Sequence, residues 1–369
     1  MWQNPLDFNV YSVDDVSAHL PVVLLRIVFG YTSAPGVVCK IINLLFSDHP
    51  TRLNYAVPSA DGKSLFVSEA DGGIFGISIA KSQKIDLSNT VQESISSFDF
   101  KLSAIQCEGW KPGVVCTSES LFVCTRDVSA FNGPLKCYSL KRMRFCKEVD
   151  LLKFLYRRDV HPVIRGQFWW NLESIVANQR FVYLLMTHII NDKYRIAVLS
   201  HGGDVITTWS VELGAHSSSF IHSSNDRVYI VEYHRDLHVY TQDGKRIHSH
   251  RNLSDSFAHE GYHIVGITSY LNNVYLLCRS YSKKLSLSVC DADGKFRHCH
   301  PILSETTHSG QEISISFEHC YTSMWIDDTD KRNPQICFFC CTSNVTPAQT
   351  TTIDKTQCCR NHAVAFVEM

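Results

Sequence analysis

Four cysteine and histidine residues near the C-terminus have the spacing of zinc ligands. Cys337 and Cys340 are three positions apart, as are Cys359 and His362, and structural zinc sites use such pairs. The apolar run 336–341 favours a strand, however, and in a strand side chains 337 and 340 point to opposite faces. No glycine-rich turn separates the two cysteines. We therefore expect buried thiols here, and predict no metal site and no cofactor.

Histidines are concentrated in one part of the chain, between positions 216 and 250. His248 and His250 share one face of a strand because they are two positions apart, which favours a polar outer face over a site. The chain contains no serine nucleophile elbow, phosphate-binding loop or dinucleotide fingerprint. We predict no catalytic residues and expect that the protein is not an enzyme. The clustered histidines are His216, His222, His234, His238, His248 and His250.

Residues 141–165 form a basic segment, with eight Lys or Arg against three Asp or Glu, or +5. Arg and Trp dominate interface energies, so the segment favours contact with a partner protein. The same side chains suit RNA, because they contact phosphates and stack on bases, and a solvated loop is a third interpretation. The candidate partner-binding residues are Lys141, Arg142, Arg144, Arg157, Arg158, Trp169 and Trp170.

The composition is that of an ordinary globular protein. The 369 residues are 44% hydrophobic and 19% charged, with a net charge of −1 and a pI near 7.0. This balance gives no overall electrostatic attraction to nucleic acid or an anionic membrane. The N-terminus lacks the pattern of a signal peptide, and the 15 cysteines are odd in number. We therefore expect thiols in a reducing compartment, either the cytoplasm or the nucleus.

Six short β-branched and aromatic runs recur along the chain and must position these residues. Their starts lie 56, 60, 47, 46 and 49 residues apart, a period typical of a β-propeller. The sequence predicts an all-β, six-bladed β-propeller with a repeat of about 46–60 residues and a short N-terminal helical element. The runs are Leu65-Phe66-Val67, Leu121-Phe122-Val123, Phe181-Val182-Tyr183, Val228-Tyr229-Ile230, Val274-Tyr275-Leu276 and Ser323-Met324-Trp325.

Turn residues separate the predicted strands. Asp243-Gly244-Lys245 and Asp293-Gly294-Lys295 lie 50 residues apart, and such Asp-Gly pairs supply the positive φ angles that tight hairpins need. We expect a propeller over 51–369 and, in 1–50, a strand at 6–12 followed by helices at 14–29 and 37–46. A further helix is expected at 150–158. We also expect at least one of the strands at 6–12 and 363–367 to close the ring by pairing into a blade whose other strands lie at the opposite end of the chain.

The best-defined repeat, residues 226–247, reads DRVYIVEYHRDLHVYTQDGKRI and resembles an NHL-type repeat. WD-like propellers share the architecture, but no Gly-His or Trp-Asp pair recurs here. The resemblance implies that the propeller acts as a platform for interactions with other molecules. Six-bladed lactonases and related hydrolases hold an axial divalent metal with Asp, Glu and Asn, which is the enzymatic alternative. The candidates for such a set are Glu69, Asn178, Glu232 and Asp327.

The N-terminal region resembles an F-box. Leu20-Pro21 and Leu24-Leu25, followed by Val38-Cys39-Lys40 and Leu44-Leu45, echo the order of that family's apolar and Cys-Lys positions. The resemblance implies that Leu20, Pro21, Leu24 and Leu25 dock a Skp-type adaptor of a ubiquitin ligase. The alternative is that the same residues pack against the propeller.

The function that the sequence predicts is therefore a non-catalytic scaffold for protein interactions. Its narrower form is a substrate-recognition subunit of a ubiquitin ligase, with an adaptor bound at the N-terminus and a partner protein on one propeller face. A hydrolase with an axial metal and an RNA-binding propeller that uses 141–165 are the alternatives.

Overall fold

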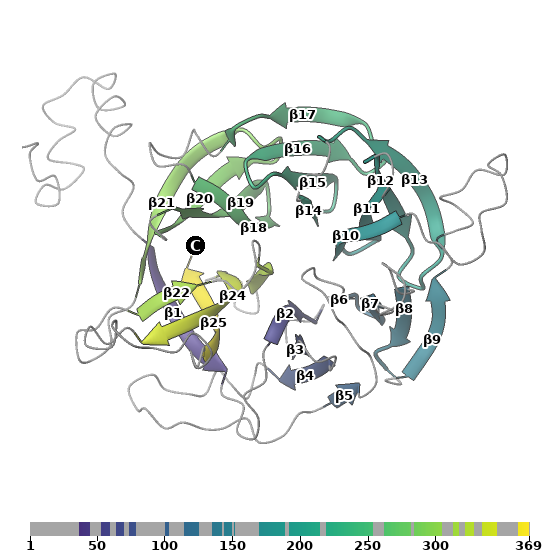
Figure 1. Ribbon diagram of the computed structural model, residues 1–369, viewed down its shortest axis with the longest axis horizontal. Helices are drawn as coiled ribbons and strands as arrows, with labels where there is room; N and C mark the ends of the chain where they lie inside the picture. The colour runs from purple at the N-terminus through teal and green to yellow at the C-terminus, as the bar shows by residue number, and fades with distance from the viewer. Residues whose placement is uncertain are drawn as a thin grey trace, which may run out of the picture.

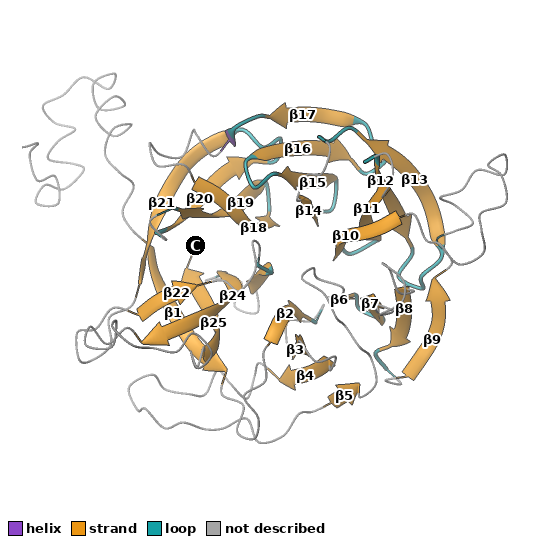
Figure 2. Cartoon of the chain, in the orientation of Figure 1, coloured by secondary structure: helices purple, strands orange, loops and turns teal. Residues whose placement is uncertain are grey.

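The computed structural model describes most of the repeated region of the chain. The described residues are 37–44, 53–59, 64–69, 74–78, 100–102, 114–124, 135–141, 144–149, 151, 170–188, 192–214, 219–253, 262–281, 284–304, 313–316, 322–327, 334–344 and 361–368. These ranges contain 25 strands and no α-helix. Figure 2 shows the strands in orange around the ring. Among the described residues there is no helix that could span a membrane.

The described strands form six blades around a central axis, which confirms the six-bladed propeller (Figure 1). Blade one contains β2 (Leu53–Pro58), β3 (Ser64–Glu69), β4 (Ile74–Ser78) and β5 (Phe100–Leu102). Blade two contains β6 (Val114–Cys116), β7 (Ser120–Cys124), β8 (Leu135–Ser139) and β9 (Arg144–Val149). Blade three contains β10 (Trp170–Ala177), β11 (Val182–His188), β12 (Tyr194–Leu199) and β13 (Val205–Val211).

The second half of the ring has the same order, from inner to outer strand. Blade four contains β14 (Ser219–Ser223), β15 (Arg227–Glu232), β16 (Asp236–Thr241) and β17 (Arg246–His250). Blade five contains β18 (Tyr262–Tyr270), β19 (Asn273–Ser280), β20 (Leu285–Asp291) and β21 (Phe296–Ser304). Blade six contains β22 (Ile313–Ser316), β23 (Met324–Asp327), β24 (Gln335–Asn344) and β25 (Asn361–Glu368), joined by β1 (Val37–Leu44).

Strand β1 closes the ring from the N-terminal side. It pairs antiparallel with β25, with Lys40 opposite Phe366 and Ile42 opposite Val364, and it also runs parallel to β21. Figure 1 shows β1 in purple beside β25 in yellow in this blade. The expected strand at 363–367 is thus present in β25. It lies in a blade with β24 from its own end of the chain, however, and the strand that joins this blade from the opposite end is β1, so the predicted way of closing the ring is wrong for 363–367. The helix expected at 37–46 is wrong over 37–44, because its apolar residues form this strand instead.

The core lies between the blades. In β11, Val182 and Leu184 pack towards blade two, whereas Tyr183 and Leu185 pack towards blade four. Alternate residues of a strand point to opposite faces, so a strand covered on both faces must be apolar throughout. This explains why the runs that predicted the repeat are continuous. In blades one to five they belong to the second strand, but in blade six the run belongs to the inner strand β23.

Glycine turns between the third and fourth strands hold neighbouring blades together. Gly203, Gly244 and Gly294 have φ angles of +83°, +91° and +82°. A Cβ on Gly244 would lie 2.6 Å from the Trp209 ring of blade three, and one on Gly294 would lie 3.0 Å from Leu237 of blade four. The positive φ angles predicted for the Asp-Gly turns are confirmed at Gly244 and Gly294. Each turn is therefore a contact with the preceding blade as well as a reversal of the chain.

Several predictions concern residues beyond the described ranges. These are the strand at 6–12, the helix at 14–29 and nearly all of the helix expected at 150–158. The division of the chain at residue 50 remains a prediction for the segment before β1, while β1 itself, which precedes that boundary, pairs within the ring.

Candidate interaction surface

A strained turn joins β15 to β16 at the edge of blade four. The amide of Arg235 donates to the carbonyl of Glu232 at 3.0 Å, and the two central residues, Tyr233 and His234, have φ angles of 50° and 60°. Such a turn normally uses Asn or Gly, and each other residue there costs roughly 1–2 kcal/mol. Observed strain of this kind occurs where surrounding structure enforces it, often at functional sites.

His234 supplies the contacts that enforce this conformation. Its carbonyl accepts a 2.7 Å hydrogen bond from the amide of Ile264 in β18, and its Nδ1 lies 3.1 Å from the Ile264 carbonyl. Since a carbonyl only accepts, Nδ1 carries the proton. The ring also packs 6.0 Å from Phe220. The β15–β16 turn is thereby clamped to the inner strand of blade five, and this makes it a rigid platform.

Below the turn, three polar side chains form a chain of hydrogen bonds across blade four. The His238 Nε2 lies 2.7 Å from the Glu232 carboxylate, which also accepts from the amide of Gly214. The His238 Nδ1 lies 2.9 Å from the Ser249 hydroxyl. Glu232 and His238 are 5% and 4% exposed. We call Glu232, His238 and Ser249 the buried relay; it links β15, β16 and β17.

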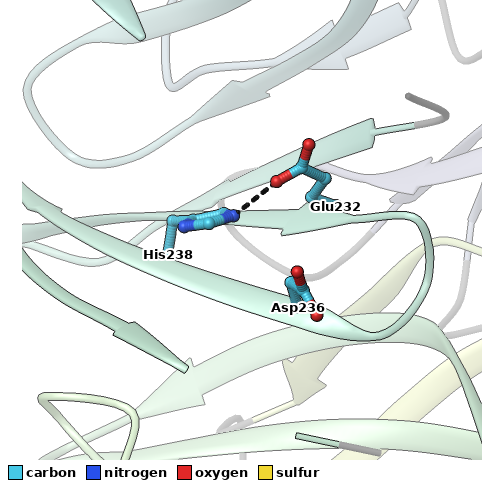
Figure 3. A group of neighbouring side chains, drawn as sticks. All are labelled: Glu232, Asp236 and His238. Carbon is cyan, nitrogen blue, oxygen red and sulfur yellow. Dashed lines mark hydrogen bonds and ion pairs between the residues drawn. The ribbon is translucent and has the colours of Figure 1, made fainter. Parts of the chain in front are cut away.

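Asp236 lies close enough to the relay to raise the question of a metal site. One ligand atom from each of Glu232, Asp236 and His238 lies within 4.8 Å of the others. Figure 3 shows Glu232 and His238 pointing towards each other, with Asp236 to one side. The Asp236 carboxylate accepts a 2.7 Å hydrogen bond from the amide of Asn252. The donor atoms are thus engaged by the protein, which fits a structural network better than a metal centre.

Above the relay, exposed aromatic and basic side chains from blades four and five are in contact. The Arg235 guanidinium donates to the Tyr281 hydroxyl at 3.3 Å, and the Tyr281 ring meets His263 edge-on at 5.0 Å. His263 is paired with Arg279 across β18 and β19. Tyr233 is 43% exposed and Tyr281 69%. We call Tyr233, Arg235, His263, Arg279 and Tyr281 the tip patch.

The electrostatics of the tip patch are dominated by cations. Desolvation lowers the pKa of His263, and the nearby Arg235 and Arg279 lower it further. Neither arginine is among the salt bridges between described residues. Burial alone would raise the pKa of Glu232, but hydrogen bonds from His238 and Gly214 outweigh it and the pKa is lowered. The patch therefore presents unneutralised positive charge over a neutral imidazole.

A second feature is an axial cavity of about 220 Å³ lined by the inner strands of all six blades. The His222 Nε2 lies 2.8 Å from the Ser269 hydroxyl there, and burial lowers the pKa of His222 to about 4. No Asp or Glu is among the described residues that line the cavity. It therefore does not fit the axial metal considered from the sequence, and the Ser-His pair lacks the carboxylate of a hydrolytic triad.

The residues proposed for that axial metal have other contacts. The Asn178 side chain accepts hydrogen bonds from the amides of Arg180 and Phe181, both at 2.9 Å, and so caps a turn. Glu232 belongs to the buried relay. The clustered histidines also separate, since His222 lines the cavity, His238 is in the relay, and the rings of His248 and His250 lie 5.8 Å apart on β17. The common face expected for His248 and His250 is confirmed.

The partner-binding residues predicted from the sequence are described only in part. Lys141 is exposed in the turn between β8 and β9, and Arg144 begins β9. Trp170 is buried at the start of β10, with its ring 4.9 Å from His188, so it belongs to the core. Arg142, Arg157, Arg158 and Trp169 lie outside the described residues.

The other sequence-based candidates lie mostly outside the described ranges. Leu20, Pro21, Leu24 and Leu25, the expected adaptor-docking residues, are among these. Val38-Cys39-Lys40 and Leu44, which carried part of the F-box resemblance, form β1 of the ring. Eight of the cysteines in the described ranges are in no disulfide. Cys340 packs with Ile336 and Phe338, whereas Cys337 points to the opposite face of β24, as expected.

Comparisons with known proteins find similarity among solved structures and nowhere else. No family model matches it, and no curated protein matches it. Among solved structures, U3-55K is similar at 10% identity and a TM-score of 0.46, over 90% of this chain and 98% of that one. The β-propeller domain of Cps50 (Swd1) from Myceliophteria thermophila is similar at 8% identity and a TM-score of 0.47, over 85% and 83%. The fold assignment rests on the strand pairing described above.

Proposed function

We propose that this propeller is a non-catalytic scaffold that binds a partner protein through the tip patch. The observation that carries the proposal is the contact between exposed Tyr and Arg side chains of two adjacent blades, from Arg235 to Tyr281. Tyr and Arg are the residue types that contribute most to interface energies. Tyr233 and Arg235 stand on a turn whose backbone is fixed by the clamp at His234, so little conformational entropy of that turn is lost when a partner binds.

The position of the patch also suits docking. In each blade the turn between the second and third strands lies at the same end of the strands as the connection to the next blade. The β15–β16 and β19–β20 turns therefore share one face of the disc, which we call the connection face. Loops on a rigid scaffold are common sites of binding. Strand β9 ends on this same face, and the predicted basic residues Arg157 and Arg158 follow it in the sequence.

Affinity capture with matched variants tests the proposal. The double variant Arg235→Ala/Tyr281→Ala removes two members of the tip patch, while Leu271→Ala removes an exposed apolar side chain, 84% accessible, from the opposite face. Partners identified by mass spectrometry should be retained by the wild type and by Leu271→Ala and lost from the double variant, with melting temperatures unchanged. If the double variant retains all partners, the tip patch is not the docking surface.

The narrower role in a ubiquitin ligase has less support and remains a prediction. It depends on Leu20, Pro21, Leu24 and Leu25, because β1 takes other F-box-like positions into the ring. The variant Leu24→Ala/Leu25→Ala tests it. Loss of a Skp-type adaptor with an intact fold would support the role. A destabilisation of roughly 2–5 kcal/mol per Leu would instead identify both residues as core.

A further inference from the structure

We infer that the tip patch receives an acidic segment of the partner protein, with carboxylates placed between Arg235, Arg279 and His263. The inference rests on the proposed function and adds the chemistry of the partner. A guanidinium binds a carboxylate through two parallel hydrogen bonds, and the exposed Tyr rings offer apolar contact with a polar edge. The occupant is thus an Asp- or Glu-rich stretch of polypeptide.

Charge complementarity carries the argument. Around the patch the described cations are Arg235, Arg279, Arg251 and Lys284. No salt bridge among the described residues includes any of them. Among the residues that the structure describes, the nearby carboxylates are Glu232 and Asp236, and both already accept hydrogen bonds from the protein. These two carboxylates are therefore used inside the blade, while no described ion pair neutralises Arg235, Arg279 or Lys284.

The contacts within the patch also place the positive charges together. Arg235 meets Tyr281 at 3.3 Å, Tyr281 meets His263 at 5.0 Å, and His263 faces Arg279 across the strand pair. His234 lies 6.3 Å from His263 on the other side. Both arginines act on the charge of His263, which shows that they approach the same ring. One carboxylate bound beside His263 would reduce the electrostatic repulsion that Arg235 and Arg279 exert on the protonated imidazole.

Binding should therefore be coupled to protonation of His263. In the free protein the pKa of His263 is lowered by desolvation and by Arg235 and Arg279. A bound carboxylate favours the imidazolium and raises that pKa, so binding takes up a proton. The sign follows directly: affinity for an acidic segment rises as the pH falls from 7.5 to 5.5, where glutamate side chains remain ionised.

A peptide-binding experiment tests the inference. The probe is a fluorescein-labelled peptide of eight glutamates, compared with eight glutamines, and measured by fluorescence anisotropy with the full chain. Arg235→Gln and Arg279→Gln should each weaken binding about tenfold. Lys245→Gln and Lys295→Gln are matched controls on the opposite face and should remain within about twofold of wild type. His263→Gln should abolish the increase in affinity between pH 7.5 and pH 5.5, so that the affinity of this variant no longer depends on pH in that range.

Three results would overturn the inference. The first is equal binding of the glutamine peptide, and the second is an equal loss in the two lysine variants, which would mean unspecific attraction. The third is tighter binding of an oligouridylate that is lost in both arginine variants, which would assign the patch to RNA. If the glutamate peptide fails but captured proteins still depend on Arg235 and Tyr281, the surface binds a partner that is not acidic. If capture does not depend on them, the proposed function itself fails.

Discussion

Removing His238 should destabilise blade four much more than neutralising its partner. His238→Ala deletes the imidazole between Glu232 and Ser249 and leaves an ionised, 5% exposed carboxylate with only the Gly214 amide as a donor. Glu232→Gln keeps the shape and an oxygen acceptor for Gly214. His238 can then change tautomer, accept from the new amide at Nε2 and donate from Nδ1 to Ser249. The two substitutions thus break the buried relay to different degrees.

The size of each effect follows from burial. His238→Ala leaves the buried Glu232 carboxylate without its imidazole donor, and removing one partner of a buried charged contact costs about 3–5 kcal/mol, so the melting temperature should fall by roughly 4–6 °C for a chain of this size. Glu232→Gln exchanges one charge-assisted hydrogen bond for a neutral one and should cost about 1 kcal/mol. In the double variant His238→Ala/Glu232→Gln no buried charge is left alone, so it should be more stable than His238→Ala.

Thermal melting and amide exchange of β15 and β16 measure these differences, with and without EDTA or zinc. The relay requires no metal, so EDTA should leave the wild-type melting temperature unchanged and zinc should not raise it. A large loss on EDTA treatment, abolished by Asp236→Asn, would refute the reasoning and identify a metal centre. Equal stability of His238→Ala and the wild type would show that the relay contributes nothing.

Three further predictions follow from the ring, its turns and its axial histidine. Deleting residues 363–369 removes most of β25, which lies between β24 and β1, and should lower the melting temperature by several degrees; no change would mean that the ring closes otherwise. Gly244→Ala should cost roughly 2–4 kcal/mol, because its φ of +91° and the Trp209 ring at 2.6 Å both oppose a Cβ, whereas Gly202→Ala has room and should be neutral in the same denaturant titration. Burial lowers the pKa of His222 to about 4, so this side chain stays neutral in the folded protein while the unfolded chain takes up a proton below about pH 6.5. Acid titration should therefore show a loss of about 3 kcal/mol in the free energy of unfolding between pH 7 and 4. The loss should be absent in His222→Gln.

The propeller was predictable because its signals are local and repeated. The runs at 228–230 and 274–276 lie in β15 and β19, and Asp243-Gly244 and Asp293-Gly294 form the turns they predict. Strand β1 was not predictable in the same way. A short apolar run such as 37–44 has no periodicity that separates a helix from a strand. Only its pairing with β25, more than 300 positions away in the sequence, decides the outcome.

The tip patch could not be found from composition, since its five residues come from three separate segments and none forms a motif. A local signal existed at Tyr233-His234-Arg235. It joins two strongly apolar runs without the Asn or Gly that a tight hairpin favours, and this absence indicates that something else must hold the turn. The sequence drew attention instead to 141–165, where charge is dense along the chain. Charged residues that are close together in the sequence need not be close together on the surface of a propeller, because successive turns of one blade alternate between its two faces.

That alternation explains why the interaction surface belongs to the connection face. A partner that crosses two blades meets residues about 46–60 positions apart in the repeat, as Arg235 and Tyr281 are, and no window along the sequence contains both. The clamp between His234 and Ile264 fixes one hairpin against the next blade, so the two hairpins present their side chains in one arrangement. The clamp offsets the backbone strain at Tyr233 and His234. As a result the turn presents an exposed Tyr and an exposed Arg at a fixed position, whereas a turn made of glycine would present no side chain there.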